Sequence, residues 1–300
     1  MKTTGLLADQ FKSEEAARQY LESIRWPNGP VCPHCGNTEK IYRLEGKATR
    51  KGVLKCAKCR KQFTVTVDTL FADSHISLDK WLYATYLICS SKKGMSSHQL
   101  HRMLDVTYKS AWFMTHRIRE AMKTPEYLTK LGGEGKFVEA DETYWGNNDK
   151  QRKGARGADH KMKVVVLVER GGEARSFHVK DVTAKTLRDV LNEQASKESH
   201  LMTDEHKSYN KVGKEFADHS IVKHSMKQYV KGIAHINTAE NFFSLLKRGL
   251  VGTFHHVGEQ HLQKYTTEFD FRYNHRKEND SLRTDAALKG IEGKRLYYSD

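Results

Sequence analysis

Three acidic residues stand where a carboxylate could hold a metal ion. Asp141 and Asp204 each follow a short run of strand-forming residues, and Glu240 lies in the stretch 235–249, which has helical apolar spacing. A carboxylate at the end of a buried strand is costly unless a positive charge pairs with it. Mg²⁺ takes carboxylate oxygens as ligands, so the repeated pattern predicts a shared cation. For each aspartate alone, capping of a turn or of the next helix explains the pattern equally well.

Phosphodiester chemistry would use such a set of acids. Two Mg²⁺ ions roughly 3.5–4 Å apart can clamp the attacking and leaving oxygens, and three acids from separate elements suffice to hold them. Lys247 follows the third acid by two helical turns and, with Arg248, could hold a phosphate. Glu139 and Glu142 flank Asp141 and are predicted to point to the other face of the strand, so neither is expected to be a ligand.

The stretch 235–249 predicts a helix with one polar and one apolar face. Thr238 can start the helix and Gly249 can end it. At a period of 3.6 residues the polar face contains Asn237, Glu240, Ser244 and Lys247. The apolar surface comes from Phe242, Phe243, Leu245, Leu246 and Leu250. Taken alone, the stretch could also be an amphipathic surface helix with an incidental charge pair.

Four of the five cysteines form two C-x-x-C pairs. Cys32 and Cys35 are separated from Cys56 and Cys59 by the 20 residues 36–55, which is the spacing of a zinc ribbon with four thiolates around one structural Zn²⁺. A redox role for C-x-x-C would need a thioredoxin-like βαβ context, which the sequence lacks. Cys89 stands alone in an apolar helical stretch and is predicted to pack in the core.

The composition is strongly basic. Among 300 residues, 51 Lys and Arg oppose 37 Asp and Glu, for a net charge of +14 and a pI near 9.4. Such an excess indicates a polyanionic partner, most often nucleic acid, with a membrane surface as the alternative. The sequence has no apolar run of 18 residues, signal peptide or lipidation motif, so we expect a soluble cytoplasmic protein without a membrane partner.

Helical patterns fill the region after the cysteines. A helix from Ser77 is broken at 92–94, a second opens at Ser96 with the S-x-x-Q form of a capping box, and a third follows residue 107. A helix, a short turn and a basic helix indicate a helix-turn-helix, although any small three-helix bundle shows a similar pattern. The residues expected outside the core are Lys109, His116, Arg117, Arg119 and Lys123. Of these, Lys109, Arg117 and Arg119 are the predicted DNA contacts.

The following region predicts a mixed α/β domain. Strands are expected at 137–141, 163–168, 174–179 and 200–204, with a helix from Thr183. Carboxylates at strand ends would then converge at one edge of the sheet. The glycine-rich stretch 131–135 predicts a linker before this domain, and 145–163 predicts a loop that could touch DNA.

In its motifs the sequence resembles bacterial insertion-sequence transposases of the DDE type, specifically the group with an N-terminal zinc ribbon, a helix-turn-helix and an RNase H-like catalytic domain. The matching motifs are residues 138–146, 203–209, 235–249 and 269–276. The 35 residues between Asp204 and Glu240 are a spacing typical of DDE transposases and integrases.

The resemblance implies roles for particular residues. Asp141, Asp204 and Glu240 would hold two Mg²⁺ or Mn²⁺ ions, and Lys247 would be the basic residue after the third acid. Some members carry Asn or His at the third position, which leaves Asn237 as the alternative residue there. The implied chemistry is hydrolysis at the transposon end to free a 3′-hydroxyl, followed by attack of that hydroxyl on target DNA. No covalent enzyme intermediate is required.

The implied fold class is α/β, with an RNase H-like mixed-sheet catalytic domain at 136–276. A zinc ribbon at 31–70 and a helix-turn-helix module at 75–130 would precede it, after an N-terminal helix within 1–30 and before a polar tail at 277–300. A further DNA contact is expected from Arg248, and Arg272 and Arg276 are expected either to face DNA or to support the fold. Such an enzyme would act as a homo-oligomer on double-stranded DNA, in the cytoplasm of a bacterium and on its nucleoid.

Two other functions stay open from the sequence. An RNase H-like nuclease would use the same acids without joining DNA ends. A zinc-ribbon DNA-binding regulator would bind DNA without cutting it, and it would need neither the acids nor Lys247.

Overall fold

The computed structural model describes residues 5, 8–123, 129–146, 160–223 and 235–297, in two compact units. Unit 1 comprises Met1–Met122 and Glu278–Asp300, and unit 2 comprises Lys123–Lys277. The predicted loop at 145–163 lies largely outside the described residues. None of the described helices is long and apolar enough to cross a membrane.

Unit 1 contains a small antiparallel sheet around the cysteines. Its order is β1-β2-β3, formed by Ile41–Arg43, Leu54–Cys56 and Gln62–Phe63. The third strand ends at Phe63, because the chain turns there and Val67 N donates to Thr64 O. The Val65 and Val67 carbonyl oxygens each accept from Arg25 Nη1 at 2.8 Å, so they are not available to pair with another strand.

The helices of unit 1 begin where capping residues predict. α1 (Glu14–Arg25) starts after Ser13, whose hydroxyl accepts from Ala16 N at 3.2 Å. α2 (Leu78–Ser90) is largely buried. Ser96 and Thr107 each accept a backbone N–H, at the starts of α3 (Ser97–Leu104) and α4 (Tyr108–Ala121). α2, α3 and α4 therefore lie where the sequence pattern predicted three helices.

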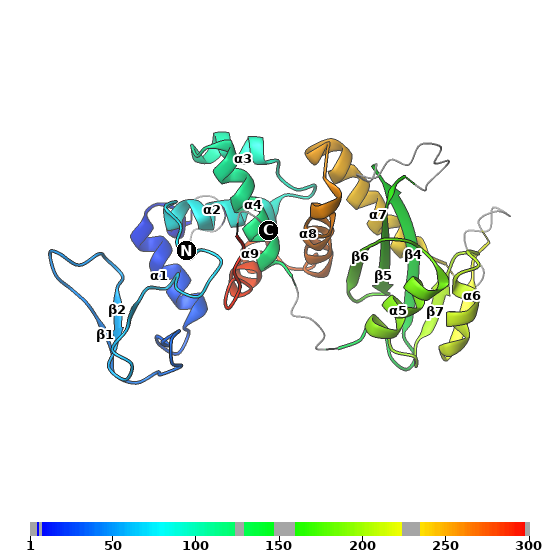
Figure 1. The fold of residues 1–300 in the computed structure, drawn as a ribbon, viewed down its shortest axis with the longest axis horizontal. Helices are drawn as coiled ribbons and strands as arrows, with labels where there is room; N and C mark the ends of the chain where they lie inside the picture. Colours follow the sequence, from blue (N-terminus) through cyan, green and yellow to red (C-terminus); the bar gives the residue numbers. More distant parts are fainter. Residues whose placement is uncertain (1–4, 6–7, 124–128, 147–159, 224–234, 298–300) are drawn as a thin grey trace. The chain divides into compact units, whose positions relative to one another are not determined.

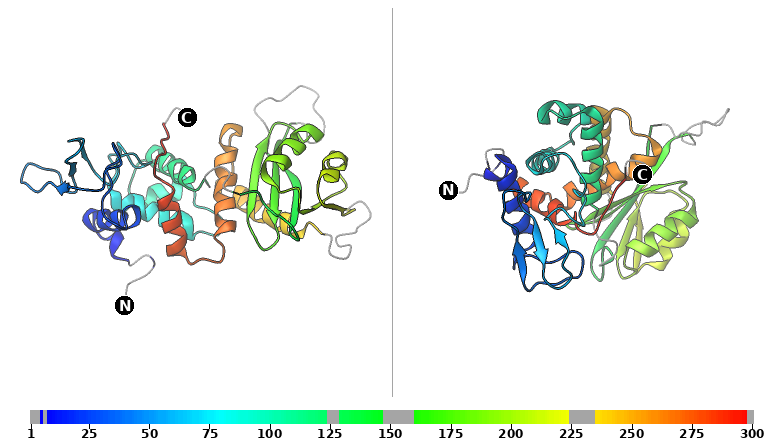
Figure 2. Two further views of the ribbon diagram at one scale, coloured as in Figure 1. Left: turned by 90° about the horizontal axis from the view of Figure 1, so that it is seen from below. Right: turned by 60° about the vertical axis from the view of Figure 1, so that its left-hand side comes forward.

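The expected polar tail contains a helix, which corrects the prediction for 277–300. α9 (Asp280–Lys289) packs on α2, and Figure 2 shows it in red. Only Thr284, Ala287 and Leu288 of this helix are buried, too few to form a clear apolar stripe in the sequence. Arg283 Nη1 donates to the Cys89 carbonyl oxygen at 2.8 Å, so the helix is also held by a polar contact.

Unit 2 has a five-stranded mixed sheet of order β6-β5-β4-β7-β8 (Figure 1). β5 runs antiparallel to both of its neighbours, whereas β7 and β8 run parallel to β4. The strands are β4 (Phe137–Trp145), β5 (Met162–Glu169), β6 (Ala174–Val179), β7 (His200–Thr203) and β8 (Asp218–Ile221). The predicted α/β class is confirmed, and β8 is a strand that the sequence prediction missed.

Two apolar layers cover the two faces of this sheet. Alternate residues of β5 divide between them: Val164, Val166 and Val168 join one core cluster, and Val165 and Leu167 join the other. α7 (Asn237–Gly249) and α8 (Leu262–Asn274) pack in the first cluster. α5 (Ala184–Gln194) and the short α6 (Tyr209–Val212) pack in the second. The sheet is thus the middle layer of three.

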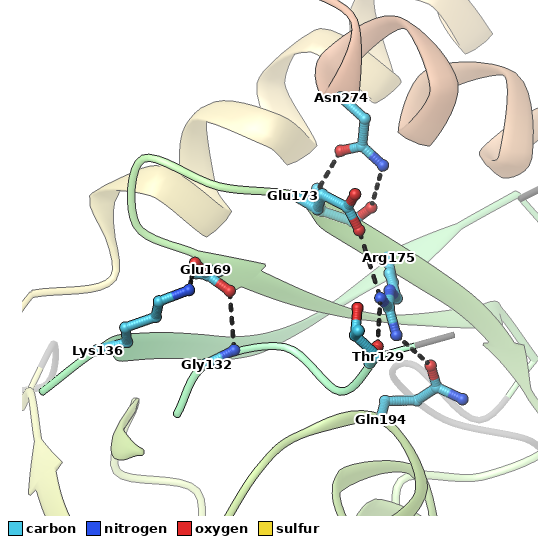
Figure 3. Close-up of polar contacts among 9 residues, drawn as sticks. Thr129, Gly132, Lys136, Glu169, Glu173, Arg175, Gln194 and Asn274 are labelled. Atoms are coloured by element: carbon cyan, nitrogen blue, oxygen red, sulfur yellow. Dashed lines mark hydrogen bonds and ion pairs between the residues drawn. The ribbon is translucent and has the colours of Figure 1, made fainter. Parts of the chain in front are cut away.

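The glycine-rich segment before β4 is anchored to unit 2 rather than free. Gly132 N donates to Glu169 Oε2 at 2.8 Å, and Lys136 Nζ donates to Glu169 Oε1 at 2.9 Å (Figure 3). Arg175 Nη2 donates to the Thr129 carbonyl oxygen at 2.8 Å. Gly132 has φ +86°, and a Cβ there would lie 1.9 Å from the Ser199 hydroxyl oxygen, so the position requires glycine. These contacts fix where β4 begins.

Candidate active site and metal centre

The four cysteines Cys32, Cys35, Cys56 and Cys59 form one cluster. Their sulfur atoms all lie within 4.8 Å of one another, with Cys32 Sγ 3.6 Å from Cys59 Sγ and Cys35 Sγ 3.8 Å from Cys56 Sγ. A tetrahedral Zn²⁺ with Zn–S bonds of about 2.3 Å holds sulfurs roughly 3.8 Å apart. Backbone N–H groups directed at Cys56 lower the pKa of its thiol to about 7, which favours the thiolate. The predicted tetrad fits a zinc ion.

Asp141 lies within β4 and not at its end, because β4 continues to Trp145. β7 pairs with β4 only over residues 137–139, where Glu139 is the partner of Met202. The pairing ends there, and extending its register by two residues would set Asp141 level with Asp204, which follows β7. The prediction that Asp141 ends its strand is therefore wrong. Asp141 does lie just beyond the part of β4 that pairs with β7.

The negative charges of neighbouring acids affect the pKa of Asp141. Burial, together with the charges of Glu142, Asp204 and Glu240, raises the pKa of Asp141 to about 8, although the N–H of Glu142 acts in the opposite direction. Asp204 follows β7 and accepts from His206 N at 2.9 Å. Glu240 is exposed in the first turn of α7. The three predicted acids are thus brought to one region by three elements.

The donor set of this acidic cluster suits a hard divalent cation. A buried carboxylate surrounded by further carboxylates is stabilised when a cation binds among them. The cluster is less compact than the cysteine tetrad, however. Among the described residues, the four cysteine sulfurs lie within 4.8 Å of one another, and the carboxylate oxygens of the three acids do not lie so close together. The carboxylates are nevertheless the type of ligand that a divalent cation binds, and they come from neighbouring elements.

Glu139 and Glu142 do not both face away from Asp141, which corrects the prediction for these two residues. Glu139 is two residues from Asp141 and shares its face, since side chains alternate along a strand. Glu142 does lie on the opposite face, yet its charge acts on Asp141. Its carboxylate accepts from the hydroxyl of the buried Tyr209 at 2.7 Å, and burial raises the pKa of the Glu142 carboxyl. No role was predicted for Tyr209 beyond its place in the matching motif 203–209, because a short helix shows no clear sequence pattern.

α7 shows the predicted two faces. Asn237, Glu240, Ser244, Lys247 and Arg248 are exposed, whereas Phe242, Phe243, Leu246 and Leu250 are buried. Leu245, expected among the apolar contacts, is 36% exposed. The helix begins one residue before Thr238, and after Gly249 the chain continues as a π-helical turn at Leu250–Phe254, so Gly249 does not end it sharply. Lys247 lies on the exposed side two turns after Glu240.

Two of the predicted DNA contacts are buried, a third is partly buried, and all three bond within the fold. Arg119 is 1% exposed and donates to Thr115 Oγ1 at 3.1 Å. Arg117 Nη1 donates to the carbonyl oxygens of Leu70 and Ala72. Arg272 is 8% exposed and pairs with Glu268. These contacts within the fold argue against direct contact of the three side chains with DNA. The sequence did not show this, because apolar and basic residues alternate irregularly in these helices.

The remaining predicted DNA contacts are exposed. Lys109 lies in the first turn of α4, and Arg248 lies in the last turn of α7. Arg276 donates to the carbonyl oxygen of Gly172 and lies 4.0 Å over the ring of Tyr273. His116, also expected outside, is 1% exposed.

Residues 130–274 match the family described as an ISXO2-like transposase domain, and residues 12–62 match the transposase zinc-ribbon domain. These matches, with the mixed sheet and the cysteine tetrad, identify the class of protein as a DDE-type transposase with a zinc ribbon. The chain belongs to the insertion-sequence transposases that combine these two domains.

A protein of the transposable element ISH50 from Halobacterium salinarum is 29% identical over 275 residues, covering 87% of this chain and 91% of that protein. A solved structure, the simian T-cell lymphotropic virus intasome in complex with PP2A regulatory subunit B56 gamma, aligns with 58% of this chain at 13% identity and a TM-score of 0.30. The alignment spans 63% of that chain, less than two thirds, and so low a TM-score does not establish a shared fold.

Proposed function

We propose that this transposase cleaves DNA at the ends of its element and transfers the freed 3′-hydroxyl into target DNA. Asp141, Asp204 and Glu240 would hold the divalent cations, Mg²⁺ or Mn²⁺, and one Zn²⁺ would hold the ribbon together. The proposal is supported by the pairing of β4 with β7 and by the hydrogen bonds from the start of α7 to Glu139 of β4, which join the elements that carry or precede the three acids, within a transposase domain.

The residues of the cluster would have different roles in the reaction. When bound, divalent ions activate the attacking oxygen and stabilise charge that develops on the phosphate. Asp141, whose pKa is about 8, carries a proton in much of the population at neutral pH and would release it on binding a cation. Asp204 and Glu240 would complete the ligand set from two other elements. Lys247, exposed on α7, would orient a DNA phosphate beside them.

DNA would be bound mainly by exposed basic residues. Lys109, Arg248 and Arg276 remain in the proposal, because they are exposed in the described structure. The ribbon at 31–70 and the helical module at 75–130 would recognise the element ends, ahead of a catalytic domain at 136–276. Joining two ends to one target needs more than one active site, so we propose that the protein acts as a homo-oligomer on DNA.

A strand-transfer assay tests this function. Labelled DNA carrying the element ends is incubated with Mg²⁺ or Mn²⁺ and with the intact protein, Asp204→Ala or Asp189→Ala. Asp189 is an exposed acid on α5 and serves as the matched control. We expect cleaved and joined products with the intact protein and the control, and neither with Asp204→Ala, although that variant still binds DNA.

Other outcomes of the same assay separate the alternatives. Cutting without joining, under conditions in which paired ends are present, would favour a nuclease. Binding of DNA with no metal-dependent chemistry would contradict the catalytic proposal and favour a regulator.

A further inference from the structure

Glu139 is a buried carboxylate that lies two residues before Asp141 on the same strand face. It is 0% exposed, and Arg170 Nε donates to its Oε1 at 2.6 Å. A buried carboxylate is costly unless it is paired and fully hydrogen-bonded, and Glu139 meets both conditions. It therefore lies beside the acidic cluster, paired with a cation of the fold.

The carboxylate of Glu139 closes the N-terminus of α7. Its Oε2 accepts from Thr238 N at 2.8 Å and from Ala239 N at 3.1 Å, and its Oε1 accepts from Thr238 Oγ1 at 2.9 Å. The residue at the usual capping position is Ile236, whose side chain cannot accept a hydrogen bond. A strand therefore supplies the cap of this helix, and the negative charge also suits the positive end of the helix dipole.

Arg170 extends the same network to β7 and to the segment before α7. Its Nη2 lies 2.7 Å from the His235 carbonyl oxygen and 2.7 Å from Met202 Sδ. Met202 is also the register partner of Glu139 in the parallel pair of β4 and β7. One ion pair thus contacts all three elements that carry the predicted acids.

Each of the three residues in this network precedes one of the predicted acids by two positions. Glu139 precedes Asp141 by two residues, Met202 precedes Asp204 by two, and Thr238 precedes Glu240 by two. We propose that Glu139, held by Arg170, is a positioning residue that sets the places of the three acids relative to one another. The inference rests on the proposed function of those acids, but the docking of α7 by Glu139 can be tested without it.

Glu139→Gln is the main test. Gln keeps the length of the side chain but replaces one acceptor oxygen by an NH₂ group, which faces N–H donors at the start of α7. We expect the amides of Thr238 and Ala239 to exchange hydrogen faster, measured by NMR or mass spectrometry. We also expect Mn²⁺ affinity, measured by calorimetry, to fall about 10- to 100-fold, the usual effect of losing an outer-shell partner.

Glu173→Gln is the matched control, because Glu173 is an exposed acid that pairs with Arg175. This control should leave both the amide exchange at α7 and the Mn²⁺ affinity unchanged. A melting curve for each variant shows whether it is folded before the comparison is made.

A milder pair of variants keeps the inference testable if Glu139→Gln does not fold. Thr238→Val removes the hydroxyl donor to Glu139 Oε1, and Thr238→Ser retains it. We expect Thr238→Val to change exchange and Mn²⁺ affinity in the same direction as Glu139→Gln but by less, and Thr238→Ser to restore both.

Unchanged amide exchange at Thr238 and Ala239 in the folded variants would overturn the inference, and so would wild-type Mn²⁺ affinity in variants with faster exchange. If the intact protein binds no Mn²⁺ at all, the proposed function fails. Amide exchange then still decides whether Glu139 docks α7, because that measurement needs no metal.

Discussion

The cysteine tetrad and the acidic cluster are two candidate metal sites built in different ways. The sulfurs of Cys32, Cys35, Cys56 and Cys59 lie within 4.8 Å of one another, whereas the acids act on Asp141 from three separate elements without gathering so closely. Two short loops, each with a C-x-x-C pair, can place four ligands through local structure. The acids instead depend on tertiary packing and repel one another, so they are expected to close fully only around cations.

The largest expected effect is loss of the ribbon in Cys56→Ser. Structural zinc supplies much of the folding energy of such small modules, so its loss should unfold the ribbon. We expect zinc content, measured by elemental analysis, to fall from one ion per chain to none, with loss of a melting transition. Mn²⁺ binding at the acids should survive, and its loss would show that the two sites are not independent.

A second comparison decides which residue of α7 completes the acidic site. We expect Glu240→Ala to lower strand transfer by more than the roughly 10- to 100-fold typical of an outer-shell residue. Asn237→Ala should change it little, although Asn237 is exposed in the same helical turn. The reverse order in the strand-transfer assay would assign the third position to Asn237.

Lys247→Ala should have a smaller effect, on DNA rather than on metal. Loss of one phosphate contact is expected to weaken binding for all DNA sequences and to reduce the slope of log affinity against log salt by about 1. Lys185→Ala, an exposed lysine on α5, is the control. Equal salt slopes for the two variants, measured by fluorescence anisotropy, would remove Lys247 from the DNA interface.

The smallest effect concerns an acid of unit 2 that is paired within the fold. Asp270 accepts from Ser176 N at 3.0 Å and from Ser176 Oγ at 2.8 Å, and burial raises its pKa to about 7. Because the folded pKa exceeds the unfolded value, its contribution to stability is present below about pH 4 and is lost as the pH rises through 7. Asp270→Asn should therefore flatten the decline in melting temperature between pH 5 and pH 8, by a few degrees at most. An identical pH profile would show that Asp270 is ionised in the folded state.

Local sequence patterns predicted the ribbon and the helix starts well. The cysteine spacing identified the tetrad, and Ser96 and Thr107 marked two helix starts, because each feature depends on residues close together in the chain. The orientation of side chains was harder to predict. Arg119 and Arg272 looked like surface residues, yet each lies buried against a partner four residues away.

Non-local packing explains the other errors. The role of Glu139 could have been suspected from its two-residue distance to Asp141, but its donors at Thr238 and Ala239 lie about a hundred residues further along the chain. β8 and α9 carry weak apolar patterns, and they are recognisable only through what they pack on. The assignment of Asp141, Asp204 and Glu240 as one metal-binding set stays a prediction, drawn from three elements that each present one acid.

Calorimetry of Mn²⁺ binding to the intact protein and to Asp141→Asn, with zinc content measured in the same samples, tests directly whether Asp141 holds a cation. We predict Mn²⁺ binding to the intact protein, its loss in Asp141→Asn, and one zinc per chain in both. Equal Mn²⁺ binding by the two proteins would contradict the assignment of Asp141 as the centre of the catalytic site.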